Sequence, residues 1–142
     1  MKRMKNIVIT GTSRGIGFEL AKQFAENGHQ VLAISRNSAP LLAINHKNIT
    51  VLSVDISNSE DLNKVADFIK NTWGKVDVLI NNAGKLINKP FTELSSDDFL
   101  EVYKVNVFAV AEITKLMLPF LQKGSHVVTI SSMGGIQGSM KF

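Results

Sequence analysis

The apolar residues of this chain fall into five short runs, separated by segments long enough to hold helices. The runs cover residues 7–9, 31–34, 49–54, 76–80 and 127–130, and several are rich in β-branched residues. Short continuous apolar runs are typical of strands that are buried on both faces of a parallel sheet. Strands that alternate with helical connections imply right-handed crossovers, which place helices on both faces of the sheet. The pattern predicts a doubly wound α/β domain with three layers.

Two connections carry explicit helix signals. Residues 57–60, Ser-Asn-Ser-Glu, match a capping box whose N-cap is Ser57. The connection before the last apolar run predicts one long helix, from about Asp98 to Leu121, with Pro119 bending or breaking its final turn. Helices of this kind suit the crossover between two parallel strands.

The chain length of 142 residues fits a single domain over residues 1–142. A complete dinucleotide-binding fold usually has six strands in two halves, whereas the sequence predicts five strands and no helix after the fifth. We therefore expect the C-terminal part of the fold to be incomplete, with the fifth strand as an unpaired edge. A shortened chain is the favoured explanation, and a partner that covers this edge is the alternative.

Composition excludes several classes of protein. Apolar residues make up 44% and charged residues 20%, which is the balance of a globular protein. The net charge of +4 comes from scattered basic residues, apart from Lys2, Arg3 and Lys5, which we interpret as a solvated terminus and not as a nucleic-acid arm. The sequence has no signal peptide, no transmembrane stretch and no cysteine, so we expect a cytoplasmic protein without membrane or nucleic-acid partners. No metal is expected, because the three histidines are far apart in the sequence.

A glycine-containing loop lies between the first apolar run and the first helical segment. Residues 10–17 read Thr-Gly-Thr-Ser-Arg-Gly-Ile-Gly. Glycines at this place allow a tight turn and let a pyrophosphate approach the helix N-terminus. The spacing G-x-x-x-G-x-G differs from the general G-x-G-x-x-G pattern, and no lysine closes the segment as in a P-loop. Taken alone, the loop also fits a purely structural turn.

The loop resembles the cofactor loop of the short-chain dehydrogenase/reductase family in the spacing of Thr10, Gly11, Gly15, Ile16 and Gly17. Further segments resemble that family in the same order along the chain: Asp55, residues 81–84 (Asn-Asn-Ala-Gly), Asn106 and residues 130–132 (Ile-Ser-Ser). Each of these could singly be a cap, a turn or a buried structural residue. Their shared order makes the resemblance specific, and it implies a Rossmann-type NAD(P)-binding fold.

The resemblance also implies roles for individual residues. Asp55 corresponds to the acidic residue that hydrogen-bonds the adenine ring. Ser132 corresponds to the serine that polarises the substrate oxygen, and Asn106 to the asparagine that orders a helix turn and a proton-relay water. The implied cofactor-binding residues are Gly11, Ser13, Arg14, Gly15, Ile16, Gly17, Ser35, Arg36, Asp55, Ile56, Asn82, Ala83, Gly84, Val105, Ile130 and Ser131.

The choice of cofactor is argued from charge after the second apolar run. NAD-binding domains place an acidic residue there for the ribose 2′-hydroxyl, whereas an arginine favours a 2′-phosphate. The sequence has Ser35-Arg36-Asn37 at this point, and Arg14 lies in the glycine loop. Two guanidinium groups can clamp a phosphate, so we predict NADP(H). The alternative is that both arginines face solvent, in which case NAD(H) binds about equally well.

The resemblance implies hydride transfer to or from a carbonyl or alcohol carbon of a small substrate. In the family a tyrosine followed four residues later by a lysine supplies the proton, and the spacing from Ser132 places it beyond Phe142. Tyr103 is followed directly by Lys104, so we interpret it as a packing residue. Without a tuned acid the chain alone is expected to be nearly inactive, and a non-catalytic dinucleotide-binding module or an inactive fragment is the alternative. Homo-oligomers are common in the family, with the long helix from Asp98 as the expected contact.

Overall fold

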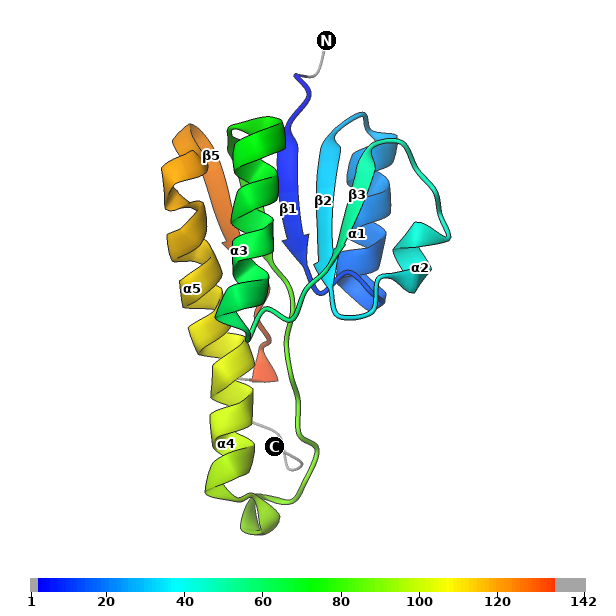
Figure 1. Cartoon of the computed structure of the whole chain (residues 1–142). Helices are drawn as coiled ribbons and strands as arrows, with labels where there is room; N and C mark the ends of the chain where they lie inside the picture. The colour runs from blue at the N-terminus through cyan, green and yellow to red at the C-terminus, as the bar shows by residue number, and fades with distance from the viewer. Residues whose placement is uncertain (1–2, 135–142) are drawn as a thin grey trace.

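The computed structural model describes residues 3–134, which form a five-stranded parallel sheet with helices on both faces (Figure 1). The strands are β1 (Asn6–Thr10), β2 (Gln30–Ser35), β3 (Ile49–Ser53), β4 (Val76–Asn81) and β5 (Leu121–Thr129). Their order in the sheet is β3-β2-β1-β4-β5, and all neighbours are parallel. This arrangement confirms the predicted doubly wound α/β fold.

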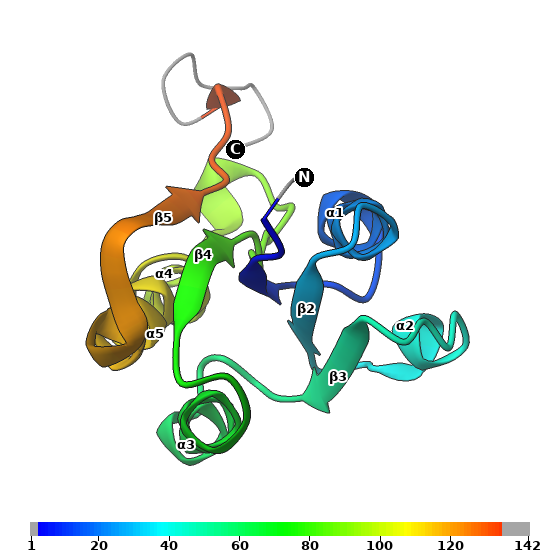
Figure 2. The same ribbon diagram turned by 90° about the horizontal axis from the view of Figure 1, so that it is seen from above.

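The connections form two helical layers, which are separated clearly when the molecule is seen from above (Figure 2). One side of the sheet carries α1 (Gly15–Glu26) and the short α2 (Ala39–Leu42). The other side carries α3 (Ser59–Phe68), which continues as the π turn η1 (Ile69–Trp73), and a long helix. That helix consists of α4 (Ser96–Tyr103), the π turn η3 (Lys104–Phe108) and α5 (Ala109–Met117). Two 3-10 turns, η2 (Phe91–Glu93) and η4 (Leu118–Phe120), complete the connections.

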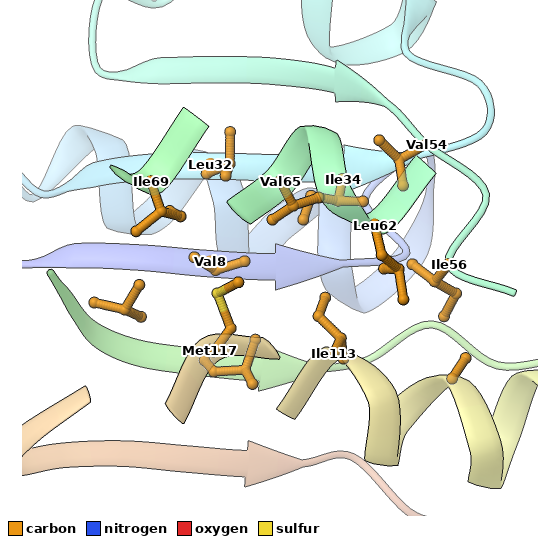
Figure 3. Packing of buried hydrophobic residues seen from close by; sticks show 13 residues of the cluster. Val8, Leu32, Ile34, Val54, Ile56, Leu62, Val65, Ile69, Ile113 and Met117 are labelled. Atoms are coloured by element: carbon orange, nitrogen blue, oxygen red, sulfur yellow. The ribbon is translucent and has the colours of Figure 1, made fainter. Parts of the chain in front are cut away.

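Successive side chains of the strands point to opposite faces and enter two apolar clusters. On the α3 side, Val8 of β1 packs with residues of α3 and α5 such as Val65 and Ile113 (Figure 3). Its neighbours Ile7 and Ile9 enter the cluster beneath α1. Each of these side chains is almost fully buried, and such burial contributes roughly 1.5–3 kcal/mol per aliphatic side chain. The two clusters fix both helical layers against the sheet.

The expected capping box at the start of α3 is wrong. The N-cap is Asn58, whose side chain accepts hydrogen bonds from the backbone amides of Glu60 and Asp61 at 2.9 and 3.3 Å. Ser57 instead donates its hydroxyl to the carboxylate of Asp55 at 2.7 Å. The amide of Glu60, which the predicted capping box assigns to Ser57, is bound by the side chain of Asn58, so the helix is capped one residue later than predicted.

The predicted long helix is present, but its middle and its end differ from the prediction. It widens into a π turn at η3 and ends at Met117, not at Leu121. Pro119 lies in η4, and Leu121 already pairs with Val76 of β4. Pairing with a neighbouring strand therefore starts β5 before the apolar run at 127–130, with an irregular register between the two strands. Such pairing is a long-range contact that local apolar patterning does not report.

Within the described residues, β5 forms one edge of the sheet, as predicted, and β3 forms the other. Val127 and Val128 are 46% and 41% exposed, so this strand is much less covered than β1. The prediction that no helix follows the fifth strand falls on residues beyond 134, which lie outside the described residues. Among residues 3–134, no helix combines the length and the apolar character that a membrane span requires.

Candidate functional site

The strand order reverses between β1 and β4, because the chain leaves β1 toward β2 on one side and returns to β4 on the other. In an open parallel sheet, ligands bind outside the carboxyl ends of the strands at such a switch point. The loop after β1 begins at Gly11 and the loop after β4 begins at Asn82. Both predicted nucleotide motifs therefore meet at the expected place.

Thr10 joins these two loops. Its buried hydroxyl oxygen accepts hydrogen bonds from the backbone amides of Asn82 and Ala83 at 3.1 and 3.0 Å. In return, the side-chain amide of Asn82 donates to the carbonyl oxygens of Thr10 and Gly11, each at 3.0 Å. The reciprocal bonds hold the glycine loop and the loop after β4 as one unit.

The three glycines of the loop are needed for different reasons. A Cβ atom on Gly11 would lie 2.6 Å from the Cα of Ala83, and one on Gly17 would collide with the side chain of Asn82. Gly15 has a φ of +61°, which side chains rarely adopt, and no atom lies within 4 Å of its Cβ position. Gly11 and Gly17 therefore allow close packing, while Gly15 leaves the loop open to an approaching group.

The N-terminus of α1 has the features of an anion site. Its N-cap is Arg14, and no side chain caps the first backbone amides of the helix. Uncapped amides and the positive end of the helix dipole suit a phosphate group. Ser13 is partly buried here, and Ile16 on the first turn is 61% exposed. The residues present at this end of the sheet thus fit the pyrophosphate of a dinucleotide.

Two arginines lie at the carboxyl ends of the strands. Arg14 precedes α1 and Arg36 follows β2, and both side chains are exposed. Neither guanidinium forms an ion pair with a residue of the described chain. Ser35 is buried and donates its hydroxyl to the carbonyl oxygen of Asn37 at 2.7 Å, which shapes the turn that carries Arg36.

Asp55 and Ile56 follow β3 at the same edge. Hydrogen bonds from Ser57 lower the pKa of Asp55 below its usual value, with help from Arg36 and Lys104 and against the opposing effect of burial. At neutral pH the carboxylate is ionised and can only accept hydrogen bonds. The side chain of Ile56 is buried in the apolar cluster, so only its backbone can reach a ligand at the edge.

Asn106 lies in η3 and holds the loop that follows β4. Its Oδ1 accepts from the backbone N–H of Lys85 at 2.7 Å, and its Nδ2 donates to the carbonyl oxygen of Lys85 at 2.9 Å. Val105 beside it packs against the apolar cluster. π turns within helices occur frequently at functional sites. The side chain of Asn106 therefore orders the loop after β4, and the implied role in holding a helix turn and a proton-relay water stays a prediction.

A cavity of about 420 Å³ lies between the ends of β4 and β5 and the long helix. It is lined by Asn81, Asn82, Ala83, Gly84, Asn106, Val110, Thr129, Ile130, Ser131 and Ser132. The fold thus brings the two predicted catalytic residues, Ser132 and Asn106, to one cavity with part of the predicted cofactor set. The remaining predicted residues do not line the cavity: those on the glycine loop and at or after the ends of β2 and β3 lie along the carboxyl ends of the strands, and Val105 lies in η3.

Sequence reasoning missed the side-chain contacts of Asn81, which is 2% exposed. Its backbone carbonyl oxygen accepts from the backbone N–H of Ile130 at 2.9 Å, and its side-chain Nδ2 donates to Thr114 Oγ1 at 3.2 Å. Asn81 therefore ties the segment that leads to Ser132 to α5. Thr10 was part of the recognised motif but was not assigned a binding role. Neither contact had a local signal, because the partners are far apart in the sequence.

Tyr103 does not line this cavity. It is 52% exposed on the surface of α4, with its ring centroid 6.4 Å from that of Phe108. Within residues 3–134, no group of three or more acidic or histidine side chains is gathered closely enough to hold a metal ion.

The family model described as short chain dehydrogenase matches residues 5–142. The chain belongs to the short chain dehydrogenase family. This is an oxidoreductase family whose Rossmann-type fold binds nicotinamide dinucleotides. Membership explains why the glycine loop, Asp55, residues 81–84 and Asn106 occur in this order.

The relatives of this chain carry names that refer to different substrates. The chain is 32% identical to a ketoacyl reductase, HetN, of Nostoc sp., over 94% of this chain and 50% of that protein. It is 35% identical to the 7alpha-hydroxysteroid dehydrogenase of Escherichia coli, over 91% of this chain and 53% of that protein. The chain therefore spans about half the length of the curated relatives it matches.

Solved structures superpose closely on this fold. A short-chain dehydrogenase from Streptomyces avermitilis matches with a TM-score of 0.90 and 28% identity, over 100% of this chain and 54% of that one. An alcohol dehydrogenase from Thermococcus sibiricus, complexed with 5-hydroxy-NADP, matches with a TM-score of 0.88 and 28% identity. The match covers 98% of this chain and 63% of that one.

Proposed function

We propose that the protein binds NADP(H) and serves in hydride transfer to or from a carbonyl or alcohol carbon of a small substrate. The observation that carries this proposal is the uncapped N-terminus of α1 beside the open, left-handed Gly15. This arrangement offers free amide donors and an unobstructed approach at the switch point of the sheet. The bound cofactor would supply the hydride chemistry itself.

The proposed cofactor site runs along the carboxyl ends of the strands. The start of α1 would hold the pyrophosphate, Asp55 would contact the adenine, and the cavity at β4 and β5 would receive the nicotinamide end. The proposed binding residues are Gly11, Ser13, Arg14, Gly15, Ile16, Gly17, Ser35, Arg36, Asp55, Ile56, Asn82, Ala83, Gly84, Val105, Ile130 and Ser131.

The preference for NADP(H) rests on Arg14 and Arg36. Both are exposed and unpaired within the described residues, so neither must break an ion pair to meet a 2′-phosphate. Charge-assisted bonds from a guanidinium group to phosphate are among the stronger hydrogen bonds in proteins. The similarity to an alcohol dehydrogenase that was solved with 5-hydroxy-NADP adds support.

Ser132 and Asn106 are the proposed catalytic residues. The Oγ of Ser132 accepts a hydrogen bond from the backbone N–H of Gly134 at 3.1 Å, which leaves its own proton for a substrate oxygen. Such a donor stabilises charge that develops on that oxygen. Asn106 contributes by holding the loop at Lys85 against the helix.

The side chains that line the cavity in the described part of the chain are amides, hydroxyls and apolar groups. A hydroxyl such as that of Ser132 titrates far from neutral pH and is a poor general acid. We therefore expect residues 1–142 by themselves to bind the cofactor and to turn over slowly. This observation also favours a second candidate, a dinucleotide-binding module without catalysis.

We also propose that a second copy of the chain covers the long helix. Phe99, Leu100, Tyr103, Val107 and Phe108 are each between 45% and 61% exposed along α4 and η3. A surface with this many large apolar side chains is typical of a protein interface. A small-molecule substrate and a cytoplasmic location complete the proposal, and both come from the sequence and the family.

The proposed cofactor is tested by calorimetric titration of the purified chain with NADPH and with NADH. NADPH should bind more tightly, and Arg36→Asp should weaken NADPH by about tenfold or more while leaving NADH unchanged or tighter. Arg3→Asp is the matched control. It makes the same change in charge, but Arg3 precedes the start of β1, at the end of the strand away from the proposed site. A folded sample that binds neither nucleotide would refute the proposal, and equal binding of both would refute its selectivity.

A further inference from the structure

The carboxylate of Asp55 is held through one of its two oxygens. Oδ1 accepts hydrogen bonds from the backbone N–H of Ser57 at 2.9 Å and from its hydroxyl at 2.7 Å. Within residues 3–134, no hydrogen bond reaches Oδ2. The two donors come from one residue, so the side chain of Asp55 is fixed in a single orientation with one oxygen still able to accept.

The backbone of Asp55 is fixed as well. Its N–H donates to Oδ2 of Asp61 at 2.9 Å, and the other carboxylate oxygen of Asp61 pairs with Lys64. Asp61 lies in the first turn of α3, which Asn58 caps. The start of α3 therefore holds both the main chain and the side chain of Asp55.

We propose that Ser57 is a positioning residue that presents Oδ2 of Asp55 to the amino group of the cofactor's adenine. This inference rests on the proposed function, which places the adenine beside Asp55. An ionised carboxylate only accepts hydrogen bonds, so it favours a base that carries an N–H donor at that position. Holding the carboxylate in advance lowers the entropy that binding must remove.

The charges around Asp55 support this role. Arg36 from the end of β2 and Lys104 from η3 favour its ionised form, and Asp61 of α3 is itself neutralised by Lys64. Ser57 makes the largest contribution to the lowered pKa of Asp55, and burial opposes it. Loss of the Ser57 hydroxyl should therefore raise the pKa of Asp55 and weaken the adenine contact first at acidic pH.

The test compares two ligands on three forms of the protein. The ligands are NADPH and its purine analogue, in which hydrogen replaces the 6-amino group. Ser57→Ala should weaken NADPH by about threefold to tenfold, since one bond to a charged acceptor is lost, and should leave the analogue within about twofold. Ser59→Ala is the matched control, because that hydroxyl bonds to Glu112 and not to Asp55. It should change neither affinity.

Further variants separate the outcomes. Ser57→Thr keeps a hydroxyl and should restore the affinity for NADPH, and Asp55→Asn reports the adenine contact directly. If Ser57→Ala weakens both ligands equally, or neither, the positioning role is refuted. If in that case Asp55→Asn weakens NADPH but not the analogue, the proposed cofactor site stands without the positioning role of Ser57. If the folded wild type binds neither ligand, the proposed function fails and this inference fails with it.

Discussion

Asn106 and Lys85 form a reciprocal pair of hydrogen bonds, with the side-chain amide of Asn106 bound to both backbone groups of Lys85 at 2.7 and 2.9 Å. The side-chain amide of Asn106 thus satisfies both backbone groups of Lys85, as a neighbouring strand would. The loop after β4 is thereby fastened to η3 without any strand beside it. The position of the proposed active site thus depends on a contact between segments 21 residues apart.

Replacing Asn106 should therefore loosen the loop. Asn106→Ala removes two exposed hydrogen bonds and should lower the free energy of unfolding by about 1–2 kcal/mol. Lys85→Ala is the control, because Lys85 contributes through its backbone and this variant loses only the surface ion pair with Glu101. We expect that control to stay within about 0.5 kcal/mol of the wild type in urea unfolding. Equal effects of both variants would contradict the prediction.

Thr10 offers a test of the junction between the two loops. Thr10→Val removes the acceptor for the amides of Asn82 and Ala83 and leaves two N–H groups without a partner. We expect a loss of about 2–4 kcal/mol in the free energy of unfolding. Thr10→Ser retains the hydroxyl and should lose clearly less. Chemical denaturation of both variants measures the difference, and similar losses would show that packing of the methyl group matters more than the hydrogen bonds.

Gly17 should tolerate no side chain. A Cβ atom at this position collides with the carbonyl group of Gly11 and with Asn82, so Gly17→Ala must displace backbone. Overpacking of this kind costs about 1–3 kcal/mol, and the same shift should abolish nucleotide binding. Gly84→Ala is the comparison, because the closest atom to its Cβ is Oδ1 of Asn106 at an ordinary 3.6 Å. A melting temperature of Gly17→Ala as high as that of Gly84→Ala would disprove the packing argument.

Asp98 should make stability depend on pH in acid. Hydrogen bonds from Lys89 and Ser95 lower the pKa of Asp98 to about 2, from an ordinary value of 3.8. Folding therefore favours the ionised form, and the stabilisation is complete above pH 3.8 and is lost as the pH falls through about 2. Asp98→Asn should lower the melting temperature at pH 7, and its difference from the wild type should shrink between pH 4 and pH 2. A difference that stays constant over this range would show that the carboxylate charge is not responsible.

Much of the fold was predictable because its signals are local. The continuous apolar runs identified all five strands, and the run at 76–80 was placed to within one residue of β4 (Val76–Asn81). The long helix begins at Ser96, two residues before the predicted start at about Asp98, and its N-cap Ser95 forms a capping box with Asp98. The start of α3 was not predicted correctly, because Asn58, directly after Ser57, is also a favourable N-cap residue and binds the amide that the capping-box pattern assigns to Ser57.

The candidate site divides in the same way. The spacing of the glycines, Asp55, Asn106 and Ser132 was visible in the sequence, because each motif is short and its order along the chain is characteristic of the family. The bonds from Thr10 to Asn82, from Asn81 to Thr114 and from Asn106 to Lys85 were not visible. Each joins groups from distant segments, and the residue types involved also occur in ordinary turns.

The sequence by itself determined the alternation of strands and helices, and it placed the glycine loop directly after the first strand. These features depend on apolar periodicity and on backbone conformations that individual residues allow. Only the tertiary structure decided that β5 begins at Leu121, that the long helix widens at η3, and that Asn106 holds Lys85. Those outcomes depend on which donor meets which acceptor after the layers have packed, and that competition is resolved in three dimensions.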